Sequence, residues 1–101
     1  MAQRKVSVLA RVRDKIAYIA YFIESKGMPD TAKEFVDDCM QFFENLNNPK
    51  IKHRPCSNLV WNKKGYRCAT FRKKFIVAFI DREDEIIICD FVPQKLVSSR
   101  I

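Results

Sequence analysis

Apolar residues recur at helical spacing in two stretches of the first half of the chain. The first stretch contains Val12, Ile16, Ile19, Ala20 and Ile23. This spacing places them on one side of an α-helix, and we expect Tyr18, Tyr21 and Phe22 to broaden the apolar face. Gly27 and then Pro29 predict the helix end, because Gly accepts the left-handed cap conformation and Pro cannot continue the helix.

The second stretch gives the clearest periodicity in the chain. It contains Ala32, Phe35, Val36, Cys39, Met40, Phe43 and Leu46. We expect this helix to begin near Asp30 and Thr31, either of which can cap it, and Thr31 with Glu34 fits a capping box. Residues 47–49 predict its end. The short connection between the two stretches predicts an antiparallel helical hairpin.

The period changes to two in the second half of the chain, which is typical of strands. Expected strands cover residues 5–9, 59–61, 66–71, 75–80 and 86–92, with turns at 62–65, 72–74 and 81–85. Residues 50–57 are basic and irregular. The sequence therefore predicts one α+β domain over residues 1–101. It has an N-terminal strand and an antiparallel two-helix hairpin packed on a curved antiparallel β-sheet of about four strands.

Positive charge is concentrated in the middle of the chain. The formal net charge is +7, and the stretch from residue 45 to residue 80 holds nine cations and no carboxylate. Those cations are Lys50, Lys52, Arg54, Lys63, Lys64, Arg67, Arg72, Lys73 and Lys74. Because such a field attracts phosphates and carboxylates, we expect these residues to bind a target or a nucleic acid.

The cysteines give no support to a metal site. The chain has four cysteines and one histidine, none of the cysteines forms a CxxC pair, and zinc sites usually need paired ligands at short spacing. We expect four free thiols, mostly buried, in a reducing cytoplasm. No cofactor is expected, and no apolar run reaches the roughly 18–20 residues of a membrane span.

Local patterns stand out at residues 18–23, 30–36, 65–67, 75–79 and 85–88. Together they resemble the RelE/ParE toxins of bacterial type II toxin–antitoxin systems. Residues 18–23 resemble the first-helix pattern of ParE-like proteins, and residues 30–36 resemble their second helix. Gly65-Tyr66-Arg67 is similar to a strand start in that family, and residues 75–79 and 85–88 are similar to its paired central strands. The resemblance covers roughly residues 5 to 92.

The resemblance implies two kinds of action. ParE-type members bind and stall DNA gyrase, whereas RelE-type members cut mRNA on the ribosome, and both are neutralised by a cognate antitoxin with an acidic wrapping segment. The stretch after the last strand of the family often carries His, Tyr or Arg. Here residues 91–95 carry only Lys95 as a basic group. This departure argues against an RNA-cleaving activity. It leaves open a gyrase-directed toxin, or a degenerate member of the family that only binds its antitoxin.

Three residues are weak catalytic candidates for RNA cleavage. His53 titrates near neutrality in an ordinary environment, although a lone histidine in a basic loop is more often a solvated surface residue. Arg67 and Arg72 can stabilise a phosphate. For Arg67 we expect a place on the open face of the sheet, with an ion pair to Asp90 as the equal alternative. Trp61 is expected in the core rather than as an exposed anchor.

Three functions remain open from the sequence. The first is a toxin that binds an essential target, with DNA gyrase foremost, and is held inactive by its antitoxin. The second is a ribosome-dependent mRNA endonuclease that uses Arg67 with the 50–54 basic cluster. The third is a small nucleic-acid-binding or structural domain without toxicity.

Overall fold

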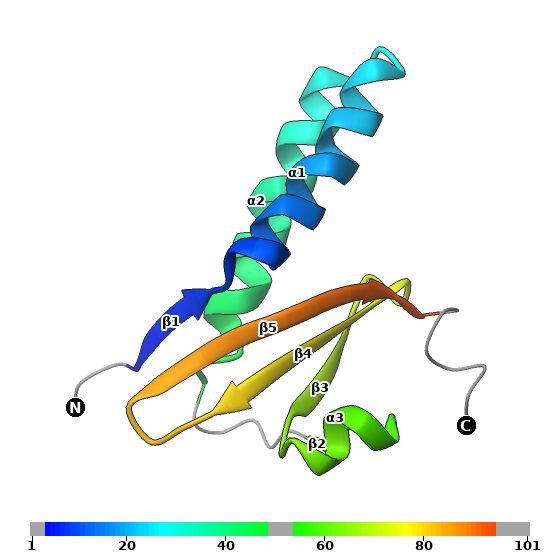
Figure 1. Ribbon diagram of the computed structural model, residues 1–101. Coiled ribbons are helices and arrows are strands. Elements are labelled where there is room, and N and C mark those ends of the chain that lie inside the picture. Colours follow the sequence, from blue (N-terminus) through cyan, green and yellow to red (C-terminus); the bar gives the residue numbers. More distant parts are fainter. Residues whose placement is uncertain (1–3, 49–53, 95–101) are drawn as a thin grey trace.

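A computed structural model describes residues 4–48 and 54–94 of the chain (Figure 1). A strand and a helical hairpin come first, and a two-residue strand and a short helix then precede three longer antiparallel strands. The elements are β1 (Lys5–Val8), α1 (Ala10–Ser25), α2 (Pro29–Asn45), β2 (Arg54–Pro55), α3 (Leu59–Lys63), β3 (Arg67–Phe71), β4 (Phe75–Asp81) and β5 (Glu85–Pro93). The α+β class predicted from the sequence is confirmed.

The sheet has five strands in the order β1-β5-β4-β3-β2. Neighbouring strands are antiparallel except for β1, which runs parallel to β5. The expectation of about four antiparallel strands was therefore wrong in number and in one direction. Because a helical hairpin and the other strands separate β1 from β5 in the chain, strand alternation along the sequence does not reveal how β1 pairs. Strand β2 has only two residues and lies within the segment that we took as irregular.

The turn between α1 and α2 confirms one sequence signal and corrects another. Gly27 has a φ of +84° and its N–H donates to the carbonyl of Glu24, so it ends α1 as predicted. Helix α2 begins at Pro29, and its start has no side-chain cap. The predicted caps at Asp30 and Thr31 are wrong because proline, whose fixed φ suits the first helical position, starts the helix earlier.

Residues 59–61, which we predicted to be a strand, belong to the short helix α3. Asn58 begins this helix, because its side-chain oxygen accepts a hydrogen bond from the Trp61 N–H at 3.1 Å. Gly65 ends it with a φ of +77°, and the Tyr66 N–H reaches back to the Trp61 carbonyl. These two signals overrule the strand propensity of three consecutive apolar residues.

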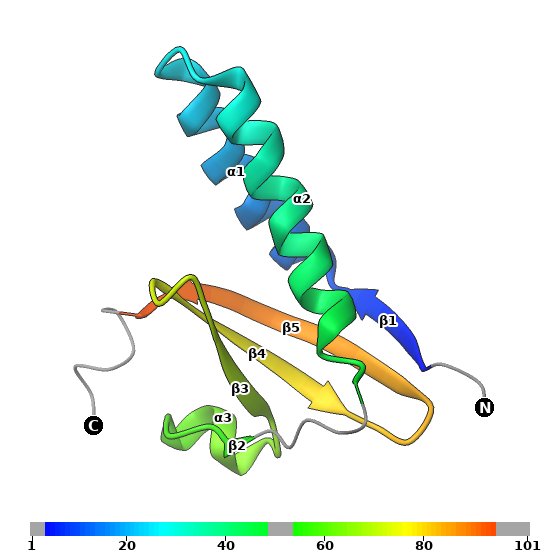
Figure 2. The same cartoon turned by 180° about the vertical axis from the view of Figure 1, so that it is seen from behind.

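A cluster of phenylalanine rings attaches the hairpin to one face of the sheet. The Phe35 ring of α2 lies 6.2 Å from the ring of Phe71 and 6.5 Å from that of Phe91, measured between centroids. Phe43 contacts Phe91 from the same helix at 6.3 Å. Figure 2 shows that the hairpin rises from the sheet, so its tip projects beyond the strands.

The outer side of α1 carries exposed aromatic residues. Tyr18, Tyr21 and Phe22 are 74%, 69% and 54% exposed, and the ammonium group of Lys26 lies 5.2 Å from the centre of the Phe22 ring. We expected these three rings to widen the buried face, which was wrong. Helical spacing places Tyr18 and Tyr21 on the side of α1 away from Val12 and Ile16, its two buried residues, and Phe22 at the flank between the two sides.

The turn between β3 and β4 places two charged residues in the left-handed region. Arg72 and Lys73 have φ values of +54° and +59°, and the Lys74 N–H donates to the carbonyl of Phe71. Residues with a Cβ adopt this region at a cost. The Arg72 side chain forms an ion pair with Asp38 on α2.

The Phe35→Ala variant should lower the free energy of unfolding by about 3–5 kcal/mol, since the ring is 3% exposed and its loss leaves a cavity. Tyr18→Ala removes an aromatic ring from the exposed side of the same hairpin and should change stability by no more than ~0.5 kcal/mol. Urea denaturation measures both. Equal losses for the two variants would contradict the assignment of the buried face.

The Lys73→Gly variant should raise stability by about 0.5–1 kcal/mol, because glycine adopts a positive φ without the clash of a Cβ. The matched control is Lys74→Gly, which lies in the same turn outside the left-handed region and should be neutral or destabilising. Thermal melting compares the two variants. A melting temperature that falls for Lys73→Gly would refute the strained turn.

Candidate functional site

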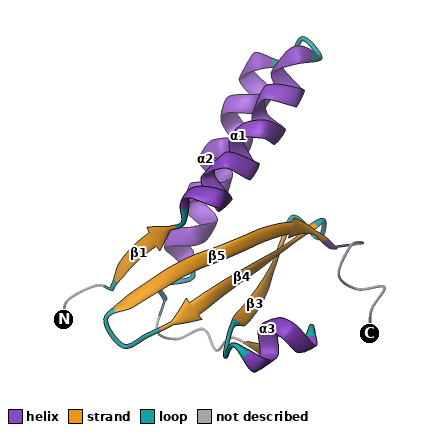
Figure 3. Ribbon diagram, in the orientation of Figure 1, coloured by secondary structure: helices purple, strands orange, loops and turns teal. Residues whose placement is uncertain are grey.

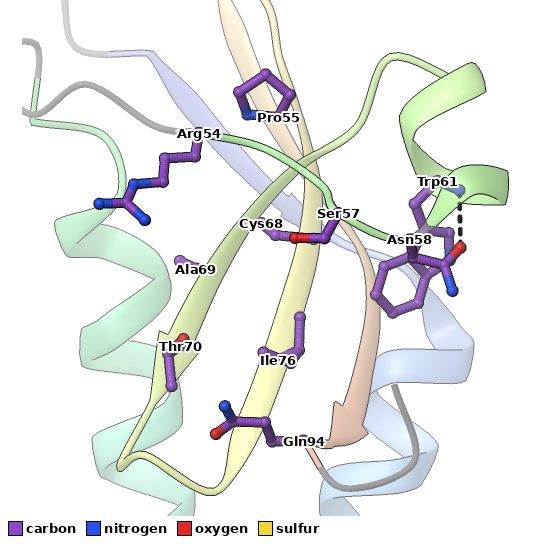
Figure 4. Close-up of a pocket in the computed structure, with 10 residues that line it drawn as sticks. All are labelled: Arg54, Pro55, Ser57, Asn58, Trp61, Cys68, Ala69, Thr70, Ile76 and Gln94. Atoms are coloured by element: carbon purple, nitrogen blue, oxygen red, sulfur yellow. Dashed lines mark hydrogen bonds between the residues drawn. The ribbon is translucent and has the colours of Figure 1, made fainter. Parts of the chain in front are cut away.

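A pocket of about 240 Å³ opens on the face of the sheet opposite the hairpin (Figure 4). It lies between strands β3 and β4 on one side and the segment from Arg54 to Trp61 on the other. Figure 3 shows α3 on this side of the sheet, away from α1 and α2. The pocket exists because side chains alternate along β3, so that Cys68 and Thr70 face away from the ring cluster that holds Phe71.

The floor of the pocket is apolar and its walls are polar. Cys68 and Ile76 form part of the floor (Figure 4). The rest of the lining includes Ser57, Asn58, Trp61, Thr70 and Gln94. A half-buried indole, two amides and two hydroxyl groups can hold a small flat or hydrogen-bonding group. The pocket is smaller than the roughly 300–1,000 Å³ of drug-sized ligand sites, so it fits part of a larger partner better than a whole ligand.

Arg54 supplies a positive charge among the residues that line the pocket. It is exposed, it stands on β2, and its Cα pairs with that of Cys68 in the sheet. Figure 4 shows its guanidinium pointing away from Trp61, toward the outside of the pocket. Arg54 therefore offers its charge at the rim rather than at the floor, where an incoming carboxylate or phosphate meets it first.

The other predicted cations divide between the two ends of β3. Lys63 is the last residue of α3 and Lys64 follows it as the C-cap, just before β3 begins at Arg67. Lys73 and Lys74 lie in the turn after β3, and the Gln94 N–H donates to the Lys74 carbonyl at 2.7 Å. Because Gln94 lines the pocket, exposed positive charge lies near both of its ends. We call Arg54, Lys63, Lys64, Lys73 and Lys74 the basic rim.

Arg67 lies on the side of the sheet that carries the hairpin. It shares this face of β3 with Ala69 and Phe71, as the alternation predicted, but this face is the covered one and not the open one. The alternative ion pair with Asp90 is also wrong. The carboxylate of Asp90 instead forms an ion pair with the Lys15 ammonium group of α1, at 2.6 Å between nitrogen and oxygen. The register of β5 places Asp90 beneath α1.

Arg72 serves the fold rather than the open face. Its guanidinium pairs with Asp38 and lies 5.4 Å from the ring centres of both Phe35 and Phe71. These contacts hold the β3–β4 turn against α2. The remaining predicted candidates, Lys50, Lys52 and His53, lie outside the described residues.

Two of the four cysteines are joined. Cys56 and Cys68 form a disulfide, and their Cα atoms are 4.9 Å apart. The expectation of four free thiols was therefore wrong. The pairing of β2 with β3 brings the two residues together, with Arg54 opposite Cys68. The sequence predicts residues 54–57 to be irregular, and nothing in the spacing of the cysteines indicates this contact.

Cys39 and Cys89 are the free cysteines of the chain, and both are buried. Burial raises the pKa of the Cys39 thiol to about 12, against a smaller opposing effect of the Arg72 charge. Burial also raises the pKa of the Cys89 thiol. Both thiols therefore stay protonated at neutral pH, which makes them poor nucleophiles and poor metal ligands.

Neither a metal site nor a membrane-spanning helix is found in the described ranges, 4–48 and 54–94. In these ranges no three His, Cys, Asp or Glu side chains are grouped to hold a metal ion. Over the same residues, none of the helices is long and apolar enough to cross a bilayer.

Trp61, which we expected in the core, is half-buried and lines the pocket instead.

The pocket and its basic rim are suited to binding a hydrogen-bonding, negatively charged partner. Polar groups that donate and accept hydrogen bonds surround an apolar floor, and the basic rim lies near both ends. Asn58, Thr70 and Gln94 were not predicted from the sequence, since uncharged polar residues carry no pattern of their own. The pairing of β3 with β4 and of β4 with β5, together with the position of α3, brings them together.

Comparisons with known proteins add no family assignment. No protein-family model, no curated protein and no solved structure matches the chain. The resemblance to the RelE/ParE toxins therefore stays a prediction from the residues.

Protein purified in air without reductant should react as two thiols per chain with a colorimetric thiol reagent in denaturant, and as four after full reduction. Under native conditions the reaction should be slow, because Cys39 and Cys89 are buried and protonated at neutral pH. Four thiols in denaturant before reduction would contradict the disulfide.

Proposed function

We propose that this chain is the toxin component of a bacterial type II toxin–antitoxin pair, and that it acts by binding an essential target. DNA gyrase is the target that we favour. A cognate antitoxin holds the toxin inactive. The proposal combines the resemblance of residues 5–92 to the RelE/ParE toxins with the shape and charge of the open face of the sheet.

One observation carries the proposal, namely the pocket with exposed basic residues near both ends. Arg54 lines it, Lys63 and Lys64 flank the start of β3, and Lys73 and Lys74 flank its end. Charges of one sign around a hydrogen-bonding cleft speed encounter with an acidic partner and orient it. The uncharged lining then supplies specificity, because a buried polar group left without a partner costs binding energy.

The antitoxin has two surfaces to cover. An acidic segment matches the basic rim, and an apolar segment matches the aromatic side of α1, where Tyr18, Tyr21 and Phe22 are exposed. Large exposed aromatic residues close together on one helix mark a protein-binding surface more often than a solvated one. One partner that contacts both surfaces would hide the open face from the target.

Induced expression in bacteria tests the proposed function. Growth arrest with loss of DNA supercoiling and a DNA-damage response is the result that we expect. Rapid translation arrest with cleaved transcripts would favour the endonuclease instead, although Arg67 lies on the face away from the pocket. Normal growth on expression of the chain alone would overturn both and leave a non-toxic binding domain.

Reversal of three rim charges, Arg54→Glu with Lys63→Glu and Lys64→Glu, should weaken binding to an acidic partner about tenfold or more, with a larger effect at low salt. The variant should also relieve growth arrest. The matched control reverses three exposed cations elsewhere, Arg13, Lys33 and Arg82, for the same change in net charge. A titration in which both variants lose the same affinity would attribute binding to net charge and remove the basic rim from the mechanism.

A further inference from the structure

The disulfide between Cys56 and Cys68 closes a loop that forms one wall of the pocket. We call residues 56–68 the disulfide loop; it contains α3, and its members Asn58 and Trp61 line the pocket. Cys68 itself lines the pocket from β3. The covalent bond therefore joins this wall of the pocket to β3, which contributes to the floor.

The loop has few other attachments. Of residues 54–66, Cys56 is the one buried residue, and α3 has none. Leu59 and Val60 are 75% and 60% exposed, so these apolar side chains of the loop do not enter the core. A segment with few buried apolar contacts opens at low cost in free energy.

Backbone pairing adds only a short contact. Strand β2 pairs with β3 at two positions, Arg54 with Cys68 and Pro55 with Arg67. The Cys56 N–H donates to the Tyr66 carbonyl at 3.3 Å, and the Asn62 side-chain amide donates to the Cys56 carbonyl at 2.9 Å. Both of these bonds join residues within the disulfide loop, and neither involves a residue of β4.

We propose that the Cys56–Cys68 disulfide is a reversible redox lock on the pocket, closed when oxidised and open when reduced. Oxidation holds the loop against β3 and forms the wall that carries Asn58 and Trp61. Reduction releases the loop and removes that wall, while the ring cluster under the hairpin keeps the rest of the sheet folded. In a reducing compartment a disulfide of this kind acts as a sensor rather than as a permanent crosslink.

The chemical step is thiol–disulfide exchange with a dithiol reductant. One thiolate of the reductant attacks the Cys68 sulfur from the pocket side, the S–S bond breaks, and Cys56 leaves as a thiolate that takes up a proton. The second thiolate of the reductant then displaces Cys68, which is also protonated. Two electrons pass to the protein, and the reductant becomes a disulfide.

The two other cysteines do not compete in this exchange. Cys39 is 0% exposed and Cys89 is 2% exposed. Burial also raises the pKa of both thiols, so neither offers a thiolate at neutral pH. The exchange is therefore confined to the pair at the pocket.

Hydrogen exchange read by mass spectrometry tests the lock directly on the full chain. On reduction with dithiothreitol, amide exchange in residues 58–66 should rise by roughly tenfold or more, while exchange in β4 stays unchanged. Reoxidation in air should restore the slow rate. Unchanged exchange in residues 58–66 would overturn the lock. An equal rise in β4 would also overturn it, because it would show that the disulfide stabilises the whole fold and not the loop alone.

Fluorescence provides a second readout, because the chain has one tryptophan and Trp61 lines the pocket. Emission should change on reduction of the wild-type protein. The Cys56→Ser/Cys68→Ser variant should resemble the reduced protein and should not respond to dithiothreitol. A response of equal size in that variant would attribute the change to the reductant and overturn the lock.

The consequence for target binding rests on the proposed function, whereas the lock itself does not. If the pocket contacts the target, the oxidised protein should bind the target about tenfold more tightly than the reduced protein. Hydrogen exchange needs no target, so failure of the lock and failure of the toxin proposal are distinguishable. Opening of the loop on reduction, without growth arrest on expression, would contradict the toxin proposal and leave the lock intact.

Discussion

The contact between the phenylalanine rings of α2 and those of the sheet determines how the rest of the molecule is arranged. Phe35 and Phe43 pack on Phe71 and Phe91, and all four rings are buried. Aromatic rings of this kind contribute large apolar area in a chain too small for a deep core. Because this contact commits the hairpin to one face, the alternate residues of β3 and β4 face the other way and become available for the pocket.

The two sides of the pocket differ in how they are held. The floor belongs to β3 and β4, and the β4 residues Val77 and Phe79 are fully buried. The wall belongs to a loop with almost no apolar contact, and a covalent bond takes the place of packing there. A rigid floor with a weakly attached wall is a physical basis for regulation, since a small chemical change acts on the wall alone.

The sequence predicted the elements whose signals are local and repeated. The period of α2 and the glycine at position 27 were read correctly, and so was the apolar run that became the central strand β4. Helix α3 was missed because three apolar residues have no period, although Asn58 and Gly65 carried its caps. The exposed rings of Tyr18 and Tyr21 were misread, because the hairpin extends past the sheet and nothing in their own spacing reveals that.

Of the features of the candidate site, only its positive charge could be predicted from the sequence. Arg54 and the lysines of the basic rim came from the run without carboxylates, but Arg67 and Arg72 proved to lie against the hairpin side. Thr70 and Gln94 are uncharged and lie far apart in sequence. They meet only through strand pairing, and so does the disulfide, which depends on the two-residue strand β2.

The central claim is that the face opposite the hairpin is the binding surface. Amide chemical-shift mapping tests it most directly, with isotope-labelled oxidised protein and a short poly-glutamate peptide as the acidic probe. We expect the shifts to cluster at Arg54, Thr70 and Gln94 and to fade as salt is added. Shifts that cluster on the outer side of α1, or that spread evenly over the surface, would contradict the account.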